Sequence, residues 1–200
     1  MSGIDVVFCD VGGVLLTNGW DHSQRHRACE HFDLDWEEFE DRHQFVAERF
    51  ETGRIDLELY LERTVFYRER PFSVEDFAQT MRSGSRPLDG GIGLVRRIAS
   101  TRLTMATINN ESRALNEYRI SRFGLDEIFT AFFSSCYLGV SKPDDQIFRI
   151  ALAVMAVESE RAVFIDDRPI NIESAAGLGF HTIRHVDAAT TERALADLGL

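Results

Sequence analysis

Lysine is nearly absent from this sequence. All but one of its 22 basic residues are arginine, and Lys142 is the exception. Lysine is a compact ammonium group on a thin stem, whereas arginine carries a broad planar fork. Because arginine is used at every other basic position, Lys142 is a candidate for a narrow site that holds a small anion and has no room for arginine.

Basic runs, long apolar segments and cysteine pairs are also missing. The net charge is −11 and no basic run is present, so nucleic acid and anionic membranes are poor candidate partners. No apolar stretch is long enough to span a membrane, and the first residues lack a signal-peptide pattern. The three cysteines, Cys9, Cys29 and Cys136, fit neither a zinc spacing nor a disulfide framework. We therefore expect a cytoplasmic protein with free thiols, either a monomer or a homodimer.

The segment from Asp21 to about Arg82 is aromatic, charged and helix-periodic. One apolar stripe at helical spacing consists of Trp36, Phe39, His43, Val46 and Phe50. Further helices are expected over residues 55–67 and 74–81, and no strand pattern interrupts them. The sequence predicts a small all-α insert over residues 18–83.

Short apolar strands alternate with helices in the rest of the chain. Strands are expected at residues 6–8, 103–107, 131–133, 162–165 and 181–183. The helix running to Met155 is expected to begin at Pro143, because proline suits a first helical position. This alternation predicts a doubly wound, Rossmann-like α/β core with a parallel sheet, formed by residues 1–17 and 84–200.

Polar and charged residues follow the predicted strands. The first strand is followed by Asp10, the second ends at Thr107 to Asn110, a loop after the third contains Lys142, and the fourth is followed by Asp166 and Asp167. Ligand sites of such sheets lie at the carboxyl ends of the strands. Three crowded carboxylates repel one another, and Mg²⁺, which prefers oxygen ligands, would relieve this. Mg²⁺ and Lys142 together could hold a phosphoryl group for attack by a carboxylate.

Three ordered motifs carry a family resemblance. Residues 8–15 (Phe-Cys-Asp-Val-Gly-Gly-Val-Leu) resemble the first motif of the haloacid dehalogenase superfamily. Ser141-Lys142-Pro143 resembles its third motif, and residues 164–167 with Asn171 resemble its fourth. The predicted insert lies where a small helical cap stands in this family. The resemblance spans nearly the whole chain and implies a hydrolase of small phosphorylated metabolites.

The resemblance also implies a role for each motif residue. Asp10 would be the nucleophile and a metal ligand, and Gly12 would offer its backbone carbonyl to Mg²⁺. Lys142 would screen the phosphate. One of Asp166 and Asp167 would bind the metal directly, and counting back from Asn171 favours Asp167.

Two departures from the family pattern stand out. Gly12 occupies the place where most phosphatases of this family carry a second Asp as general acid and base, and a subset similar to sugar-phosphate phosphatases shares this gap. His22 or His26 could supply the proton instead. In the second motif Ile108 separates Thr107 from Asn109. Either Thr107 binds phosphate from a shifted register, or Asn109 and backbone amides bind it without a hydroxyl. Asn110 is a further candidate substrate-binding residue.

Two other functions remain open at this point. A metal-independent haloacid dehalogenase would use the equivalent Asp against carbon and would not need the Asp166–Asp167 pair. A phospholigand-binding protein with weak turnover would keep the metal site without the second Asp.

Overall fold

A five-stranded parallel sheet forms the centre of the computed structural model, which describes residues 3–200. The strand order is β3-β2-β1-β4-β5, so the chain builds outward from β1 first to one side and then to the other. The sequence-based fold class, a doubly wound α/β core, is therefore confirmed. In chain order the strands are β1 (Val6–Cys9), β2 (Thr104–Asn109), β3 (Ala131–Ser134), β4 (Ala162–Asp166) and β5 (His181–Arg184).

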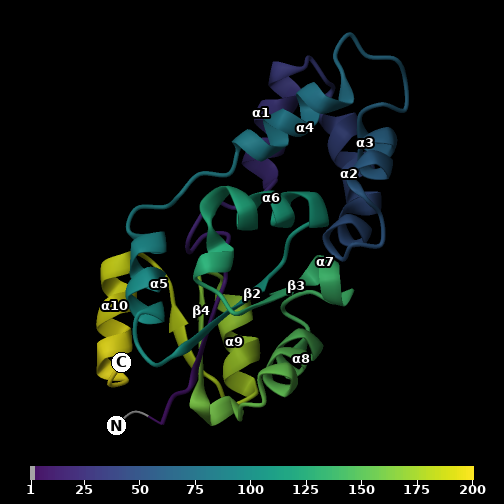
Figure 1. Ribbon diagram of the computed structural model, residues 1–200. Helices are drawn as coiled ribbons and strands as arrows, with labels where there is room; N and C mark the ends of the chain where they lie inside the picture. Colours follow the sequence, from purple (N-terminus) through teal and green to yellow (C-terminus); the bar gives the residue numbers. More distant parts are fainter. Residues whose placement is uncertain (1–2) are drawn as a thin grey trace.

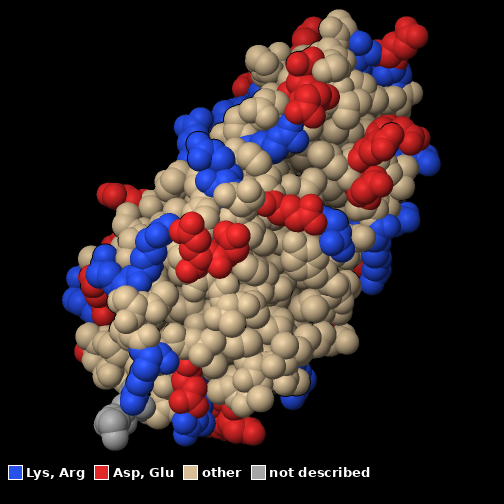
Figure 2. Space-filling model, in the orientation of Figure 1, with Lys and Arg blue, Asp and Glu red and all other residues tan. Residues whose placement is uncertain are grey.

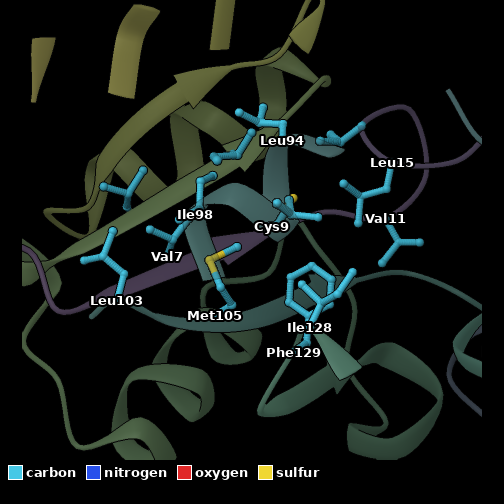
Figure 3. Packing of buried hydrophobic residues seen from close by; sticks show 14 of the residues in the cluster. Val7, Cys9, Val11, Leu15, Leu94, Ile98, Leu103, Met105, Ile128 and Phe129 are labelled. Atoms are coloured by element: carbon cyan, nitrogen blue, oxygen red, sulfur yellow. The ribbon is translucent and has the colours of Figure 1, made fainter. Parts of the chain in front are cut away.

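Helices cover both faces of the sheet. Successive strand residues point to opposite sides, and here both sides carry apolar residues that need to be buried. Val7 and Cys9 of β1 belong to the apolar cluster that includes Leu94 and Ile98 of the helix α5 (Figure 3). Val6 and Phe8 belong to a second cluster on the other face. The core helices are α5 (Gly91–Ala99), α6 (Arg113–Phe123), α7 (Ser135–Leu138), α8 (Asp145–Met155), α9 (Pro169–Gly177) and α10 (Ala188–Asp197), with short 3₁₀ turns at Leu125–Glu127 and Ser159–Arg161.

Four of the five helices between β1 and β2 form a separate group. Figure 1 shows them together at the end of the molecule beyond α6, opposite the C-terminus. They share an aromatic cluster of their own, which contains Phe39, Tyr60 and Phe77 and also Leu115 of α6. We call this group the helical insert. It consists of α1 (His22–His31), α2 (Trp36–Glu51), α3 (Leu57–Thr64) and α4 (Val74–Ser83).

Two of the element boundaries that differ from the prediction bear on the site. The helix expected to open at Pro143 begins at Asp145, because the Asp144 side chain caps its first turn by accepting a hydrogen bond from the Gln146 amide. Strand β2 continues to Asn109, two residues beyond the predicted end. Thr107 therefore lies inside the strand, and Asn110 is the first residue past it.

None of the helices among residues 3–200 is both long and apolar enough to cross a membrane. Arginine side chains are interspersed with acidic ones on the face shown in Figure 2. All three cysteines are buried, and none of them forms a disulfide within the described residues.

Candidate active site

Strand register brings the first two carboxylates together. Residues 6–9 of β1 pair in parallel with residues 162–165 of β4, so Asp10 and Asp166 occupy neighbouring positions at the carboxyl ends of adjacent strands. The Asp10 amide donates to the Ile165 carbonyl at 2.8 Å, which continues the pairing to the end of the sheet. This is also the point where the strand order reverses, the usual ligand site of open parallel sheets.

Lys142 lies between these two carboxylates. Its Nζ is 3.0 Å from Asp10 Oδ1 and 2.6 Å from Asp166 Oδ2, and its side chain is 1% exposed. Asn110 fixes the Lys142 backbone from both sides, donating to its carbonyl and accepting from its amide at 2.8 Å each. The solitary lysine of the sequence is therefore held between two acids.

Asp166 has its oxygens occupied by protein donors. Oδ1 accepts from the Arg168 amide at 2.8 Å, and Asn171 Nδ2 lies 3.1 Å from Oδ1 and 3.0 Å from Oδ2. Together with the Lys142 ammonium, these donors satisfy a carboxylate that has no exposed surface. Asp166 is thus placed to support the site rather than to offer a free oxygen.

Asp167 is the opposite case. Its Oδ1 is fully enclosed and lacks a hydrogen-bond partner among the described residues. Ligand oxygens of Asp10, Asp166 and Asp167 lie within 4.8 Å of one another. A buried carboxylate oxygen without a donor is costly unless a cation satisfies it. The donor set therefore fits a hard divalent ion such as Mg²⁺, with Asp10 and Asp167 as the carboxylates that have oxygens to spare.

The absence of a side chain at Gly13 allows the Asp167 carboxylate to pack against the Gly13 backbone. Gly13 has φ +76°, a conformation that favours glycine, and a Cβ atom there would stand 2.4 Å from Asp167 Oδ2. At Gly12 a Cβ atom would stand 3.0 Å from Asn18 Oδ1. A longer side chain at position 12 would therefore collide with Asn18 unless Asn18 moved.

Burial dominates the electrostatics of the acids. It raises the pKa of the Asp10 carboxyl to about 7; the charge of Lys142 opposes this shift, and the charge of Asp166 adds to it. Burial and the Asp166 charge also raise the pKa of Asp167. Both shifts indicate carboxylates that a nearby cation would stabilise in their ionised form.

A cavity of about 400 Å³ opens above Asp10 and Lys142. Asn110, Arg168 and Asn171 line it from the core, and Trp20, His22, Arg25, His43 and Glu51 line it from the side of the helical insert. A larger hollow of about 660 Å³ between α1 and α4 includes none of the three clustered carboxylates. The chemistry therefore belongs to the smaller cavity, which lies between insert and core.

Only one of the three phosphate ligands predicted at the end of β2 lines the cavity. Thr107 Oγ1 donates to Asn109 Oδ1 at 3.2 Å, and Asn109 in turn bonds Asn116 and Ser134, all of them buried. Thr107 and Asn109 are not among the residues that line the cavity, whereas Asn110 is. Of the two histidines considered as proton donors, His22 lines the cavity, while His26 pairs with Glu30.

Sequence reasoning did not single out two further features of this site. Arg119 of α6 forms a buried ion pair with Glu111 at 3.0 Å and lines the cavity. His43 was grouped with an apolar stripe, and it is buried on α2 as that stripe predicts, but it also lines the cavity. In neither case does a neighbouring motif in the sequence reveal the role.

Comparison with known proteins supports the family. Residues 4–179 match the family model for haloacid dehalogenase-like hydrolases. Flavin mononucleotide hydrolase 1 of Arabidopsis thaliana is 32% identical over 165 residues, which cover 80% of this chain but only 64% of that protein. The chain thus spans less than two thirds of this relative.

Solved structures share the fold over nearly the whole chain. The family enzyme bt-2542 of Bacteroides thetaiotaomicron, in complex with magnesium and inorganic phosphate, has a TM-score of 0.78 at 18% identity, covering 90% of this chain and 93% of that one. A HAD-like family hydrolase of Porphyromonas gingivalis has a TM-score of 0.76 at 24% identity, covering 96% and 98%. From the match to its family model, the chain belongs to the haloacid dehalogenase-like hydrolases.

Proposed function

We propose that this protein is a Mg²⁺-dependent phosphatase of small phosphomonoesters. The observation that carries the proposal is the arrangement of Asp10 and Lys142 beside an Asp167 oxygen that has no donor among the described residues. The family relatives whose names mention flavin mononucleotide hydrolysis, or magnesium with phosphate, support the same chemistry.

Asp10 is the proposed nucleophile. Its Oδ1 is engaged by the Val11 amide at 2.7 Å and by Lys142, which orients the carboxylate at the floor of the cavity. Attack by a carboxylate oxygen on phosphorus forms an aspartyl phosphate and breaks the bond from phosphorus to the leaving oxygen, which takes up a proton from solvent and departs as the alcohol. Water then hydrolyses the acyl phosphate, which releases inorganic phosphate and restores the Asp10 carboxylate.

Charge neutralisation is shared between side chains and metal. Lys142 offsets negative charge on the transferring group, and Asn110 holds Lys142 in place. A bound Mg²⁺ would act as a Lewis acid toward the phosphoryl oxygens, held by Asp10, Asp167 and the Gly12 carbonyl with Asp166 in support. Thr107 and Asn109 would serve by bracing the end of β2 beneath Asn110.

The helical insert is the proposed cap. With the adjoining linkers it covers residues 18–83 and supplies one wall of the cavity. Its contribution is mostly polar and charged, through His22, Arg25, His43 and Glu51. Such a wall suits a hydrophilic phosphorylated metabolite, for example a sugar phosphate, and the cap would exclude water from the reacting phosphoryl group.

A phosphate-release assay tests this proposal. Wild type and Asp10→Asn are compared on a panel of sugar phosphates, nucleotides and flavin mononucleotide, with Mg²⁺ or with EDTA. We expect turnover by wild type with Mg²⁺ only, and none by Asp10→Asn. Halide release from haloacids without metal, or Mg²⁺ binding without hydrolysis of any panel member, would contradict it.

A further inference from the structure

His43 is held by a buried hydrogen-bond relay within the helical insert. Its Nδ1 lies 2.9 Å from the Tyr60 hydroxyl, which also accepts a hydrogen bond from Trp20 Nε1 at 2.7 Å. The Phe39 ring stacks on the imidazole with planes 5° apart. Tyr60 has no exposed surface, so this relay is shielded from water.

Counting protons along the relay fixes the tautomer of His43. The Trp20 indole can only donate, so the Tyr60 oxygen accepts that bond and keeps its own proton to donate. Of the two side chains beside this hydroxyl, His43 Nδ1 at 2.9 Å is a stronger acceptor than the Thr64 hydroxyl, which donates its own proton to the Tyr60 backbone carbonyl. Because a buried hydroxyl proton needs a partner, Nδ1 accepts it and the imidazole carries its own proton on Nε2.

The Nε2–H group is left free for the cavity. Nε2 has no hydrogen-bond partner among residues 3–200. The fully enclosed polar atoms that lack a partner within these residues do not include it. Nε2 therefore keeps accessible surface, and His43 lines the cavity that holds Asp10 and Lys142. This nitrogen is therefore available to a molecule bound in the cavity.

The surroundings keep this imidazole neutral. Burial lowers the pKa of His43 to about 4, and the Arg25 charge adds to this against the weaker influence of Glu40. Arg25 is itself fixed by two hydrogen bonds to Glu40, at 3.0 and 2.8 Å, and by one to the Trp20 carbonyl. Near neutral pH the group facing the cavity is thus an uncharged donor on a rigid support.

We propose that His43 is a specificity-determining residue, whose Nε2–H donates a hydrogen bond to a neutral oxygen of the substrate's leaving group. This inference rests on the proposed function, since it assigns the part of the substrate that lies opposite the phosphoryl group. It favours hydroxyl- or carbonyl-bearing phosphomonoesters over those with purely apolar leaving groups, because a donor left unpaired in the complex weakens binding.

Nitrogen NMR of the histidines tests the tautomer without any turnover. In neutral imidazole the protonated and unprotonated nitrogens have distinct ¹⁵N shifts, and we expect the His43 pattern to show Nε2–H. Tyr60→Phe removes the donor to Nδ1 and should shift that pattern toward a mixture of tautomers. A wild-type His43 that is protonated on Nδ1, or charged near neutral pH, overturns the proposal.

Kinetics of a matched pair of variants test the specificity. His43→Gln keeps an N–H group near the Nε2 position, whereas His43→Asn keeps a partner for Tyr60 but withdraws the donor from the cavity. We expect His43→Asn to raise KM roughly tenfold with little change in kcat, the effect of losing about one neutral hydrogen bond. His43→Gln leaves the Tyr60 hydroxyl without this acceptor and should lower Tm, but its KM should stay near wild type. His26→Phe, altered outside the cavity, serves as the control.

Inorganic phosphate separates this inference from the proposed function. Inorganic phosphate has no leaving group for His43 to contact, so its inhibition constant should be unchanged in His43→Asn. If wild type hydrolyses the panel and His43→Asn keeps the wild-type KM, the His43 inference fails while the function stands. If wild type hydrolyses nothing on the panel, the proposed function fails and the inference falls with it.

Discussion

The Lys142 ammonium donates a 2.6 Å hydrogen bond to Asp166, a carboxylate with no exposed surface. Because the same ammonium lies 3.0 Å from Asp10, one cation holds the two acids that strand register sets side by side. Removing it would leave two buried carboxylates facing each other, which is far more costly than losing a surface ion pair.

Lys142→Met should lower kcat by about 10²- to 10³-fold, as removal of one fixed donor to a developing charge does in other enzymes. Lys142→Arg keeps the charge but should not restore the rate, since the broader guanidinium does not fit between acids 2.6 and 3.0 Å from Nζ. Steady-state kinetics, with circular dichroism to verify folding, provide the measurement. An arginine variant with the parent kcat would show that charge alone suffices.

Asp167→Asn should weaken Mg²⁺ binding, because it removes charge from the carboxylate whose Oδ1 has no donor among the described residues. Calorimetric titration measures the affinity, and the rise in Tm on adding Mg²⁺ gives a second readout. Asp144→Asn is the matched control, since Asn caps a helix as well as Asp and this site is exposed. Equal Mg²⁺ affinity in both variants would remove Asp167 from the metal site.

The acid limb of the pH profile of kcat/KM should move with Mg²⁺ concentration. Burial raises the pKa of Asp10 to about 7, and the nucleophile must be ionised, so at limiting Mg²⁺ activity should fall as pH drops through that value. A cation beside the carboxylate favours its ionised form, so saturating Mg²⁺ should shift the limb to lower pH. Profiles recorded at several Mg²⁺ concentrations provide the comparison. A limb that stays in place would show that another group controls it.

Arg119 of α6 contacts both linkers between the core and the insert, one at Thr17 and the other at Ser85. Besides its ion pair with Glu111, it donates to the Thr17 carbonyl at 2.8 Å and to Ser85 Oγ at 3.0 Å. The two linkers also contact each other, because Thr17 Oγ1 donates a hydrogen bond to the Gly84 carbonyl at 2.7 Å. Both ends of the insert are therefore tied together beside α6.

Arg119→Met should lower the free energy of unfolding by about 3–5 kcal/mol, because it leaves the buried Glu111 carboxylate without its partner. Burial already raises the pKa of Glu111 against the charge of Arg119. Adding Glu111→Gln should recover part of the loss, since the amide carries no charge to desolvate. Urea denaturation of both single variants and the double variant completes the cycle, and additive losses would contradict direct coupling.

The strands and their carboxyl ends were predictable because buried parallel strands are short apolar runs that end at polar residues. Asp10, Asp166 and Asp167 follow from that pattern, whereas Lys142 was indicated by being the only lysine of the sequence. The role of Thr107 could not be read in the same way, because the strand end shifts by two residues and leaves its side chain inside the sheet. One or two residues of error at a strand end are enough to exchange a cavity residue for a buried one.

His43 and Arg119 could not be found from sequence for a different reason. Each lies within a helix and carries no motif, and each reaches the cavity only because the insert folds back over the core. Their roles depend on partners distant along the chain, such as Tyr60 for His43 and Thr17 for Arg119. Helical periodicity correctly predicted that His43 is buried, but burial alone does not reveal the cavity on its other side.

The single lysine has a practical consequence for chemical labelling. Every other basic side chain is arginine, so the chain has one side-chain primary amine, and that amine is 1% exposed. Reagents that acylate amines should therefore leave the outer surface unmodified at side chains and react at Lys142 only when the cavity admits them. Protection of that single position by phosphate would report ligand occupancy directly, through one modified peptide in a mass spectrum.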